Sequence, residues 1–524
     1  MRSAVPVLAV TVLVASAVSS SLYAQTPPGA GCARLAEQKL ANTTIRSAEQ
    51  VTTGSFTPPG TTNTIANLPP FCRVAGTIAP TPDSQILFEV WLPLEAWNGK
   101  FSGVGNGGWA GVVSYPQLAD QLRRGYAAAS TNTGHAAAGG LDAARFAFEK
   151  PEQLLDFAYR SHHEMALRAK EIVAAFYAKP PARSYFIGCS SGGYEGLMAA
   201  QRFPADYDGI VAGMPANNWT RLMAGDFDAT LAVFKDGVNN LPASALGVLH
   251  RGAIAACDGK DGVSDGVIED PRSCSFDPGT LSCQTGQDAE SCLTPAQLAA
   301  ARRVYAGLKD PKSGEQIYPG LAPGSEPYWP NRDPANPFPI PISHYKWLVF
   351  ADPNWDWKSF DFSDPPDYES YRKSEAKLAP IMNATSPDLQ AFRARGGKLL
   401  QYHGWNDQLI TPFNSINYYE SVLTHAGGGR DRAATIAEVQ TFYRLFMAPG
   451  MAHCGGGSGP NNFDMQSVLE RWIEQGTAPD RIVATRAING VVDRARPLCA
   501  YPQVAVYRGS GDTNDAASFE CRAR

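Results

Sequence analysis

The 524-residue sequence lacks a strong excess of charge of either sign. It contains 45 Lys and Arg residues against 50 Asp and Glu residues, which gives a net charge of −5 at pH 7. Proteins that bind nucleic acids or anionic membranes carry a concentration of positive charge. The composition therefore predicts neither a nucleic acid nor a membrane surface as a partner.

Long apolar runs are also missing, except at the start of the chain. There a basic residue, Arg2, is followed by an apolar run to about Val18 and by a small residue at Ala24. This order is typical of a signal peptide, so we expect residues 1–24 to be removed. No later segment approaches the roughly 20 apolar residues that a membrane-spanning helix needs. The mature protein is predicted to be soluble and secreted, either to a periplasm or outside the cell.

Internal repeats and low-complexity segments are absent as well, which favours a folded, loop-rich globular protein. Its hydrophobic segments alternate between strand-like and helix-like patterns, and this alternation predicts an α/β fold with a mostly parallel sheet. The predicted strands span residues 85–92, 100–104, 126–130, 184–187, 398–402 and 441–447, and the predicted helices span residues 154–177, 193–201 and 416–426.

The alternation is interrupted in the middle of the chain. This part contains helical fragments, closely spaced cysteines and proline-rich stretches such as residues 334–341. We interpret residues 217–385 as an inserted lid domain. Residues 25–216 and 386–524 then form the two parts of one α/β domain.

The sequence Gly188-Cys189-Ser190-Ser191-Gly192 matches the pattern G-x-S-x-G, with a predicted strand directly before it and a predicted helix directly after. In this motif the serine lies in a sharp, strained turn, where larger side chains at the glycine positions would clash. The turn exposes the serine hydroxyl at the carboxyl end of the strand. The pentapeptide alone often arises by chance, and the strand and helix around it make Ser190 the candidate nucleophile.

A serine nucleophile needs a histidine base and a carboxylate that orients the histidine. In α/β-hydrolases these residues follow the serine in the order acid, then histidine, on loops after later strands. Asp407 follows the strand at 398–402, and His453 follows the strand at 441–447. We therefore predict a catalytic triad of Ser190, Asp407 and His453.

The other histidines fit this order less well. His135 and His403 also follow predicted strands, but the first precedes the serine and the second precedes the aspartate. We expect both to form structural hydrogen bonds. The remaining five are expected to be packing or surface residues, namely His162, His163, His250, His344 and His425.

All ten cysteines lie after the expected cleavage site, and an even number in an exported protein indicates disulfides. Free buried thiols at some positions are the alternative. The spacing favours the local pairs Cys257–Cys274, Cys283–Cys292 and Cys499–Cys521, and Cys32 and Cys72 are also assigned to disulfides.

Two further cysteines neighbour the predicted triad. Cys189 precedes Ser190, and Cys454 follows His453. If the serine and the histidine meet in the fold, these cysteines come close as well. We therefore expect a disulfide between Cys189 and Cys454, which would close a loop of roughly 265 residues and clamp the two catalytic loops together.

With these features the sequence resembles the tannase and feruloyl esterase family of α/β-hydrolases, in which the catalytic serine and histidine each neighbour a cysteine of one disulfide. The resemblance implies an α/β-hydrolase fold with a large inserted lid domain, and hydrolysis of esters of aromatic acids. Because the family also includes a terephthalate half-ester hydrolase, the fold does not fix the acid. The similar segments include residues 97–99, 105–108, 188–193, 207–210, 352–355 and 449–455.

Attack on an ester carbonyl also needs hydrogen-bond donors for the developing oxyanion. The backbone N–H of Ser191, directly after the nucleophile, is one donor by the geometry of the turn. The second is assigned to Asn106 or Gly107, by position and by the resemblance. Residues 103–108 also match G-x-G-x-x-G, but neither a helix start nor a later acidic residue supports a dinucleotide site.

An acidic, glycine-containing stretch lies between Cys257 and Cys274. Carboxylates at short spacings can wrap Ca²⁺, which binds six to eight oxygens, although the spacing is not that of an EF-hand. A solvated acidic turn pinned by a disulfide is the alternative. The resemblance implies a structural calcium ion, with Asp258, Asp261 and Asp265 and the carbonyl groups of Val263 and Val267 as ligands.

The predicted lid is rich in aromatic residues. We expect most of them to form the core of the lid, and one or two to contact an aromatic acyl group. The residues in question are Tyr328, Trp329, Tyr345, Trp347, Phe350, Trp355, Trp357, Phe360 and Phe362.

The sequence therefore predicts a secreted serine esterase that cleaves small aromatic acyl esters, feruloyl or other hydroxycinnamoyl esters first, through an acyl-enzyme. Tannase activity on galloyl esters and hydrolysis of terephthalate monoesters are alternatives within the family. A serine peptidase on the same fold and a non-catalytic binding protein are less favoured. No pattern in the sequence predicts an oligomeric state.

Overall fold

The structure is a computed structural model that describes Met1 and residues 28–235, 237–288, 290–329 and 334–523. The predicted signal peptide lies outside the described residues, apart from Met1. No helix in these ranges combines the length and the apolar character that crossing a bilayer requires.

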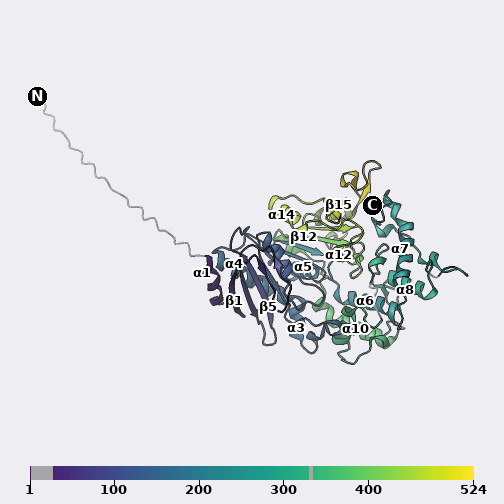
Figure 1. The fold of residues 1–524 in the computed structure, drawn as a ribbon, viewed down its shortest axis with the longest axis horizontal. Helices are drawn as coiled ribbons and strands as arrows, with labels where there is room; N and C mark the ends of the chain where they lie inside the picture. Colours follow the sequence, from purple (N-terminus) through teal and green to yellow (C-terminus); the bar gives the residue numbers. More distant parts are fainter. Residues whose placement is uncertain (2–27, 236, 289, 330–333, 524) are drawn as a thin grey trace.

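A nine-stranded sheet forms the centre of the fold (Figure 1), with the strand order β1-β4-β5-β7-β6-β8-β9-β12-β13. The six strands from β7 to β13 in this order run parallel, whereas β1, β4 and β5 pair antiparallel. This is the mostly parallel α/β sheet that the sequence predicts. The strands are β1 (Thr43–Val51), β4 (Phe71–Ile78), β5 (Ile86–Pro93), β6 (Lys100–Val104), β7 (Ala127–Thr131), β8 (Arg183–Cys189), β9 (Gly209–Gly213), β12 (Lys398–Gly404) and β13 (Tyr443–Ala448).

Helices cover the sheet and fill the chain between its strands. The predicted helix at 154–177 is interrupted by a π-helical turn, Asp156–Arg160, between α3 and α4. The helices are α1 (Pro28–Arg34), α2 (Tyr115–Arg123), α3 (Pro151–Leu155), α4 (Ser161–Tyr177), α5 (Ser191–Arg202), α6 (Trp219–Phe234), α7 (Ala243–Cys257), α8 (Pro295–Ala306), α9 (Pro339–His344), α10 (Pro365–Met382), α11 (Gln390–Ala394), α12 (Pro412–Gly427), α13 (Arg432–Val439) and α14 (Met465–Gln475).

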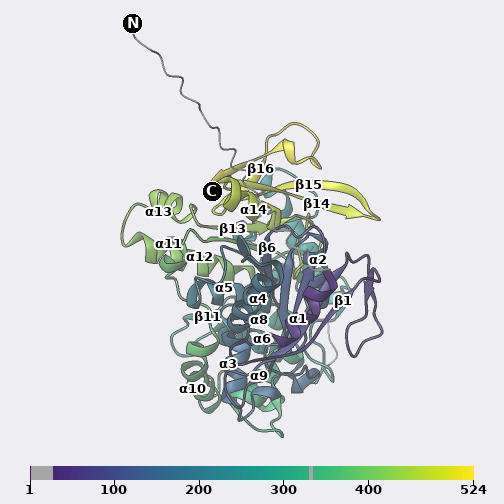
Figure 2. The ribbon, with the colours of Figure 1, turned by 90° about the vertical axis from the view of Figure 1, so that its left-hand side faces the viewer.

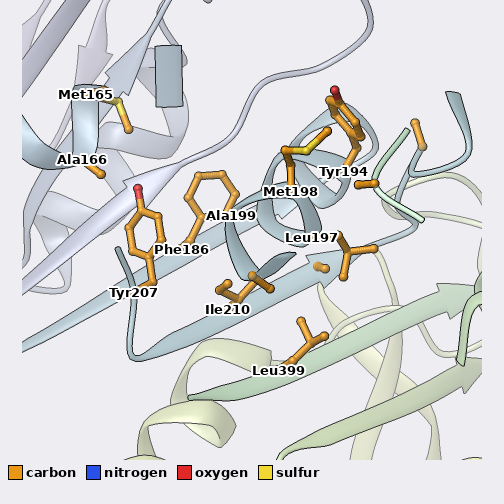
Figure 3. Packing of buried hydrophobic residues seen from close by; sticks show 14 of the residues in the cluster. Met165, Ala166, Phe186, Tyr194, Leu197, Met198, Ala199, Tyr207, Ile210 and Leu399 are labelled. Carbon is orange, nitrogen blue, oxygen red and sulfur yellow. The ribbon is translucent and has the colours of Figure 1, made fainter. Parts of the chain in front are cut away.

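The helix α5 packs directly on the parallel strands (Figure 3). Phe186 of β8, Ile210 of β9 and Leu399 of β12 belong to the same buried cluster as Leu197 of α5. A Cβ at Gly196 would come within 2.9 Å of Ile210, so this glycine permits the close approach of the helix. Burial of this apolar surface fixes α5, and with it the turn that precedes α5, against the sheet.

The segment between β9 and β12 contains the helices α6 to α11 and a short hairpin of β10 (Leu308–Lys309) and β11 (Gln316–Tyr318). Since β9 and β12 are parallel neighbours in the sheet, this segment leaves from the carboxyl end of β9, next to the carboxyl end of β8. Its helices α6, α7, α8 and α10 gather on one side of the molecule, away from β1 (Figure 1). We keep the name lid for residues 217–385, whose status as a separate inserted domain stays a prediction.

The lid has a hydrophobic core of its own. Phe227, Tyr345 and Phe360 are almost fully buried in it and pack against one another.

Small two-stranded sheets complete the fold, and the hairpin of β14 and β15 extends from the C-terminal part (Figure 2). They are formed by β2 (Ser55–Phe56) with β3 (Ile65–Ala66), β14 (Arg481–Ile488) with β15 (Val491–Cys499), and β16 (Gln503–Tyr507) with β17 (Phe519–Ala523).

Candidate active site

Ser190 lies in the turn between β8 and α5, as the sequence motif predicts. Its backbone has φ 65° and ψ −122°, a conformation that side chains disfavour. The flanking glycines are required by the close packing of this turn. A Cβ at Gly188 would lie 2.4 Å from the backbone of Gly192, and a Cβ at Gly192 would lie 3.1 Å from the carbonyl oxygen of Asn106. The strained turn directs Ser190 into a pocket at the carboxyl edge of the sheet.

Asp407 and His453 come together on the loops after β12 and β13. The imidazole Nδ1 of His453 donates to both carboxylate oxygens of Asp407, each at 2.9 Å. Asp407 is fully buried and also accepts the backbone N–H groups of Leu409 and Ile410, at 2.9 and 3.0 Å. His453 lines the same pocket as Ser190. With Nδ1 held by the carboxylate, Nε2 is the ring nitrogen left to exchange a proton with the serine.

The environment adjusts both pKa values in the direction that catalysis needs. Burial alone would raise the pKa of Asp407, but the charge of His453 and the hydrogen bonds from His403 and His453 hold this pKa well below its ordinary value. Burial alone would lower the pKa of His453, but the charge of Asp407 and its hydrogen bond raise it above the ordinary 6.5. The carboxylate therefore stays ionised, and the imidazole is a stronger base.

The two competing histidines form buried hydrogen-bond networks. The Nε2 atom of His135 lies 2.7 Å from the carbonyl oxygen of Trp109, and burial lowers the pKa of His135 to about 4. His403 lies closer to the chemistry than the sequence indicates. Its Nε2 is 3.1 Å from Asp407 Oδ2, and its Nδ1 is 2.6 Å from the hydroxyl of Ser415. His403 therefore positions the aspartate.

The described structure contains five disulfides and no free cysteine. Cys189 is bonded to Cys454, with their Cα atoms 6.0 Å apart, and both residues line the pocket. This bond ties the nucleophile turn to the loop of His453, as the adjacency in sequence predicts. The other four are the expected local pairs Cys257–Cys274, Cys283–Cys292 and Cys499–Cys521, and the pair Cys32–Cys72.

The oxyanion loop resolves the choice between Asn106 and Gly107. The backbone N–H of Asn106 donates to the Glu195 carboxylate at 2.9 Å, and the side-chain amide of Asn106 donates to the carbonyl groups of Val112 and Thr131. Asn106 therefore cannot serve as the donor. The backbone N–H groups of Gly107 and Ser191 have no partner within the described ranges, and both residues line the pocket beside Ser190. They are the candidate oxyanion donors.

A buried network that the sequence does not reveal holds this loop. The Nε2 atom of His162, on α4, lies 3.0 Å from both Asn106 Oδ1 and Glu195 Oε2. Glu195 is one turn into α5, the helix that begins directly after the nucleophile, and is only 3% exposed. Glu195 therefore links the nucleophile helix to the oxyanion loop. His162 and Glu195 belong to no sequence motif, so no local pattern indicates this role.

Replacing Glu195 with leucine is expected to lower kcat by about 100-fold, because the oxyanion loop loses its anchor and one donor of this kind contributes 100- to 1,000-fold. The effect should fall on kcat rather than KM in an assay with 4-nitrophenyl acetate. Glu195→Gln, which keeps an acceptor for the Asn106 N–H, should retain most of the rate. The matched control is Asp206→Asn, since Asp206 is another buried acid bonded to a histidine of α4, at 2.8 Å from His163. A similar kcat loss in this control would contradict the assignment.

The pocket at Ser190 has a volume of about 560 Å³ and is lined mainly by apolar side chains. Its aromatic walls are Trp219 and Phe338 from the lid and Tyr402 from β12. None of the nine lid aromatics singled out in the sequence is among the residues that line this part of the described structure. The expectation that one or two of them contact the acyl group is therefore wrong. Most of them pack within the lid, and Trp347 packs against Phe148 of the first part of the chain.

The acidic loop implied as a calcium site lies directly after α7. Asp258 accepts the backbone N–H groups of Asp265, Gly266 and Val267, at 3.0 to 3.2 Å. Burial first, and then the charges of Asp265 and Asp258, raise the pKa of Asp261 to about 6. This excess of negative charge fits a cation, and the loop also brings the carbonyl-bearing residues Val263 and Val267 to the site.

One member of the implied set fits a cation less well. The Asp265 carboxylate lies 2.6 Å from a nitrogen of Arg496 and 3.2 Å from one of Arg494, so its charge is already balanced. In the ranges that the structure describes, no group of three His, Cys, Asp or Glu side chains has the geometry of a metal site. Calcium in this loop therefore stays a prediction, with Asp258, Asp261 and carbonyl oxygens as the ligands that remain to hold it.

Comparison with known proteins supports one family. The sequence profile described as "Tannase and feruloyl esterase" matches residues 72–522. The chain is 38% identical to an uncharacterized esterase of Xanthomonas campestris pv. campestris, over 96% of this chain and 93% of the relative. It is 34% identical to a probable feruloyl esterase B-2 of Aspergillus terreus, over 89% and 91%.

Comparison of the structure with solved structures supports the same family. The crystal structure of feruloyl esterase B from Aspergillus oryzae superposes with a TM-score of 0.85 at 30% identity, over 95% of this chain and all of that one. The likeness covers the α/β-hydrolase sheet and the inserted segment together. The chain therefore belongs to the tannase and feruloyl esterase family, and it is a carboxylic ester hydrolase with the α/β-hydrolase fold.

Proposed function

We propose that the protein is a serine esterase that cleaves small aromatic acyl esters, with feruloyl and related hydroxycinnamoyl esters as its preferred substrates. Ser190 Oγ attacks the ester carbonyl while His453 takes the serine proton and then gives it to the leaving alcohol. The resulting acyl-enzyme is hydrolysed by a water molecule that His453 activates in turn. Asp407 orients the imidazole, and the N–H groups of Gly107 and Ser191 stabilise the oxyanion in both halves of the reaction.

The observation that carries this proposal is the convergence of three chain segments on one pocket. Ser190, His453, Gly107 and Ser191 all line it, and His453 is bonded to a buried carboxylate. A binding protein would have no need for a strained serine turn, a base with a raised pKa and two partnerless N–H groups at the same place. This arrangement favours a catalyst over a non-catalytic binding protein.

The pocket also favours a neutral aromatic acyl group. Apart from His453, the described residues that line it include no basic side chain. An acyl group with its own carboxylate, as in a terephthalate monoester, would be desolvated there without a cationic partner. The apolar and aromatic walls instead suit a planar ring, and relatives of similar length are named as feruloyl esterases. These relatives give no such support for a serine peptidase activity.

A panel of methyl esters tests this proposal directly. We expect kcat/KM to be highest for methyl ferulate or methyl coumarate, and about tenfold or more lower for monomethyl terephthalate, whose carboxylate finds no partner. Methyl gallate, short aliphatic esters and a peptide substrate complete the panel. Efficient hydrolysis of aliphatic esters alone, with all aromatic esters left intact, would overturn the proposed substrate class even if Ser190 were the nucleophile.

Export from the cytoplasm is the second part of the proposal. Five disulfides are typical of proteins that fold in an oxidising compartment. A signal peptide at residues 1–24 would deliver the chain there, either to a periplasm or outside the cell. Fractionation of cells that produce the full chain, with N-terminal sequencing of the mature protein, tests both the compartment and the cleavage site.

Calcium in the Asp258–Val267 loop is the third part, and its role is structural. Because calcium would bind the folded loop and not the unfolded chain, a concentration about 100 times its Kd should add about 2.7 kcal/mol to the free energy of unfolding. The melting temperature should therefore fall by roughly 3 °C when a chelator is added. The pKa of about 6 at Asp261 predicts weaker calcium binding as the pH falls below 6, when this carboxylate becomes protonated.

The control for the calcium prediction is Asp261→Asn. This variant keeps the size of the side chain but removes its charge, so its melting temperature should respond less to chelation. If the wild-type melting temperature did not change with chelator or added calcium, and elemental analysis of the protein found no calcium, the loop would be a solvated acidic turn.

A further inference from the structure

One wall of the active-site pocket is a single face of the helix α6. Trp219, Leu222, Met223 and Asp226 all line the pocket, at positions i, i+3, i+4 and i+7 of the helix. This spacing places the four side chains in one row. Three of them are apolar or aromatic, and the fourth is a carboxyl group. Leu222 and Met223 provide a surface for an aromatic ring, and Asp226 is the polar group at the end of the row.

The carboxyl group of Asp226 has no partner of its own. Across the described ranges, no hydrogen bond or ion pair to its side chain is present, and only its backbone carbonyl accepts a bond, from Thr230. Asp228, two residues further on, is bound by Arg303 at 2.6 Å. The same helix therefore holds one aspartate that the protein neutralises and one that it leaves open toward the pocket.

Among the described residues, two more buried polar groups have no partner, one on Trp219 at the other end of the row and one on Tyr318. The indole Nε1 of Trp219 is buried and has no hydrogen-bond acceptor in the described part of the chain, and this residue lines the same pocket. The ring of Tyr318 packs against Gly225, next to Asp226, and its buried hydroxyl also has no partner there. Buried polar groups in folded proteins are nearly always hydrogen-bonded. Trp219 and Asp226 both line the active-site pocket, so their unpartnered groups indicate that a ligand supplies the partner.

The protonation state of Asp226 suits a neutral ligand. Burial first, and then the nearby charge of Asp407, raise the pKa of the Asp226 carboxyl well above its ordinary value. A protonated carboxyl group both donates and accepts a hydrogen bond. It therefore matches a phenolic hydroxyl, which also does both, and it offers no charge to hold a cationic group.

We propose that Asp226 is a specificity-determining residue of the acyl pocket, whose carboxyl group hydrogen-bonds a phenolic hydroxyl on the ring of the substrate acid. The inference rests on the proposed function, because it assumes that the acyl group is aromatic. It adds the reason why a hydroxylated ring is preferred to a plain one. A plain ring leaves Asp226 unpaired in the pocket, and a site built to bind a hydroxyl discriminates strongly against the analogue that lacks it.

The test compares methyl cinnamate with methyl 3-hydroxycinnamate and methyl 4-hydroxycinnamate. In the wild type, kcat/KM for the better hydroxylated ester should exceed that for methyl cinnamate by about tenfold or more. In Asp226→Leu this ratio should fall to about one. Asp226→Asn, whose amide both donates and accepts, should keep the ratio within about threefold of the wild type. Asp228→Asn, on the same helix but outside the active-site pocket, is the matched control and should keep the ratio.

The outcomes separate this inference from the proposed function. A wild-type ratio near one overturns the inference without any variant, so the test does not depend on the folding of Asp226→Leu. A wild-type ratio above ten that persists in Asp226→Leu also overturns it. Hydrolysis of 4-nitrophenyl acetate with none of the three aromatic esters cleaved would overturn the proposed function, and the inference with it. Collapse of the ratio in Asp226→Leu alone supports the assignment.

Discussion

Asp407→Asn is expected to lower kcat by about 10,000-fold, because an amide in this place holds the imidazole in the wrong tautomer. In the wild type the carboxylate accepts the Nδ1–H of His453 in two bonds of 2.9 Å, and two backbone N–H groups fix the carboxylate. An asparagine would turn its NH₂ group toward at least one of these donors. The measurement is kcat for 4-nitrophenyl acetate, with the melting temperature of each protein as a check on folding.

The pH dependence gives a second readout of the same contact. The imidazole acts as a base only in its neutral form, so kcat/KM should rise with pH through the raised pKa of His453, above 6.5. Without the charge of Asp407, burial would dominate, and the acid limb of Asp407→Asn should move to lower pH.

Asp228→Asn is the matched control for both readouts, since Asp228 is a buried carboxylate paired with Arg303 in the lid. The free energy of unfolding of Asp228→Asn should fall, while its kcat and the pH of its acid limb should stay those of the wild type. A loss of less than tenfold in Asp407→Asn would show that the aspartate is not the orienting acid.

Replacing both Cys189 and Cys454 with serine is expected to lower the free energy of unfolding by about 5 kcal/mol, the largest effect on stability that we predict. The bond closes a loop of 265 residues, and the entropy that a cross-link removes from the unfolded chain grows with loop length. The melting temperature should fall by roughly 5 °C in calorimetry. The rate should fall as well, because the bond fixes the turn of Ser190 relative to the loop of His453.

The Cys283–Cys292 pair provides the matched control for the disulfide. Its bond closes only 9 residues, in the lid and away from the pocket. The corresponding double serine variant should lose less than about 3 kcal/mol and keep kcat. Equal losses of stability and rate in the two double variants would contradict a specific role for Cys189–Cys454.

Much of the site could be predicted because its chemistry imposes local sequence requirements. The turn of Ser190 needs small residues on both sides, and the order of acid and histidine after later strands restricts the choice of partners. The cysteines next to Ser190 and His453 added a long-range constraint that few sequences offer. Hydrophobic patterns, which are also local, predicted most of the parallel strands, such as β8 and β12.

Features that depend on tertiary contacts could not be predicted. The strand β9 reads Gly-Ile-Val-Ala-Gly and is too short for a clear period, although it lies in the middle of the sheet. Glu195 and His162 are ordinary helix residues until the fold brings them to Asn106. Composition alone also cannot tell which lid aromatics form a core and which line the pocket. The nine that we singled out pack elsewhere, whereas Trp219 and Phe338 line it.

Labelling with a fluorophosphonate tests the central claim most directly, because the reagent bonds only to an activated serine. We expect one equivalent to attach to the wild-type protein, on the peptide that contains Ser190, with loss of activity in parallel. Ser190→Ala should take up no label and have no measurable esterase activity, while its melting temperature stays close to that of the wild type. Labelling at a different serine, or esterase activity that survives in Ser190→Ala, would contradict the assignment of Ser190 as the nucleophile.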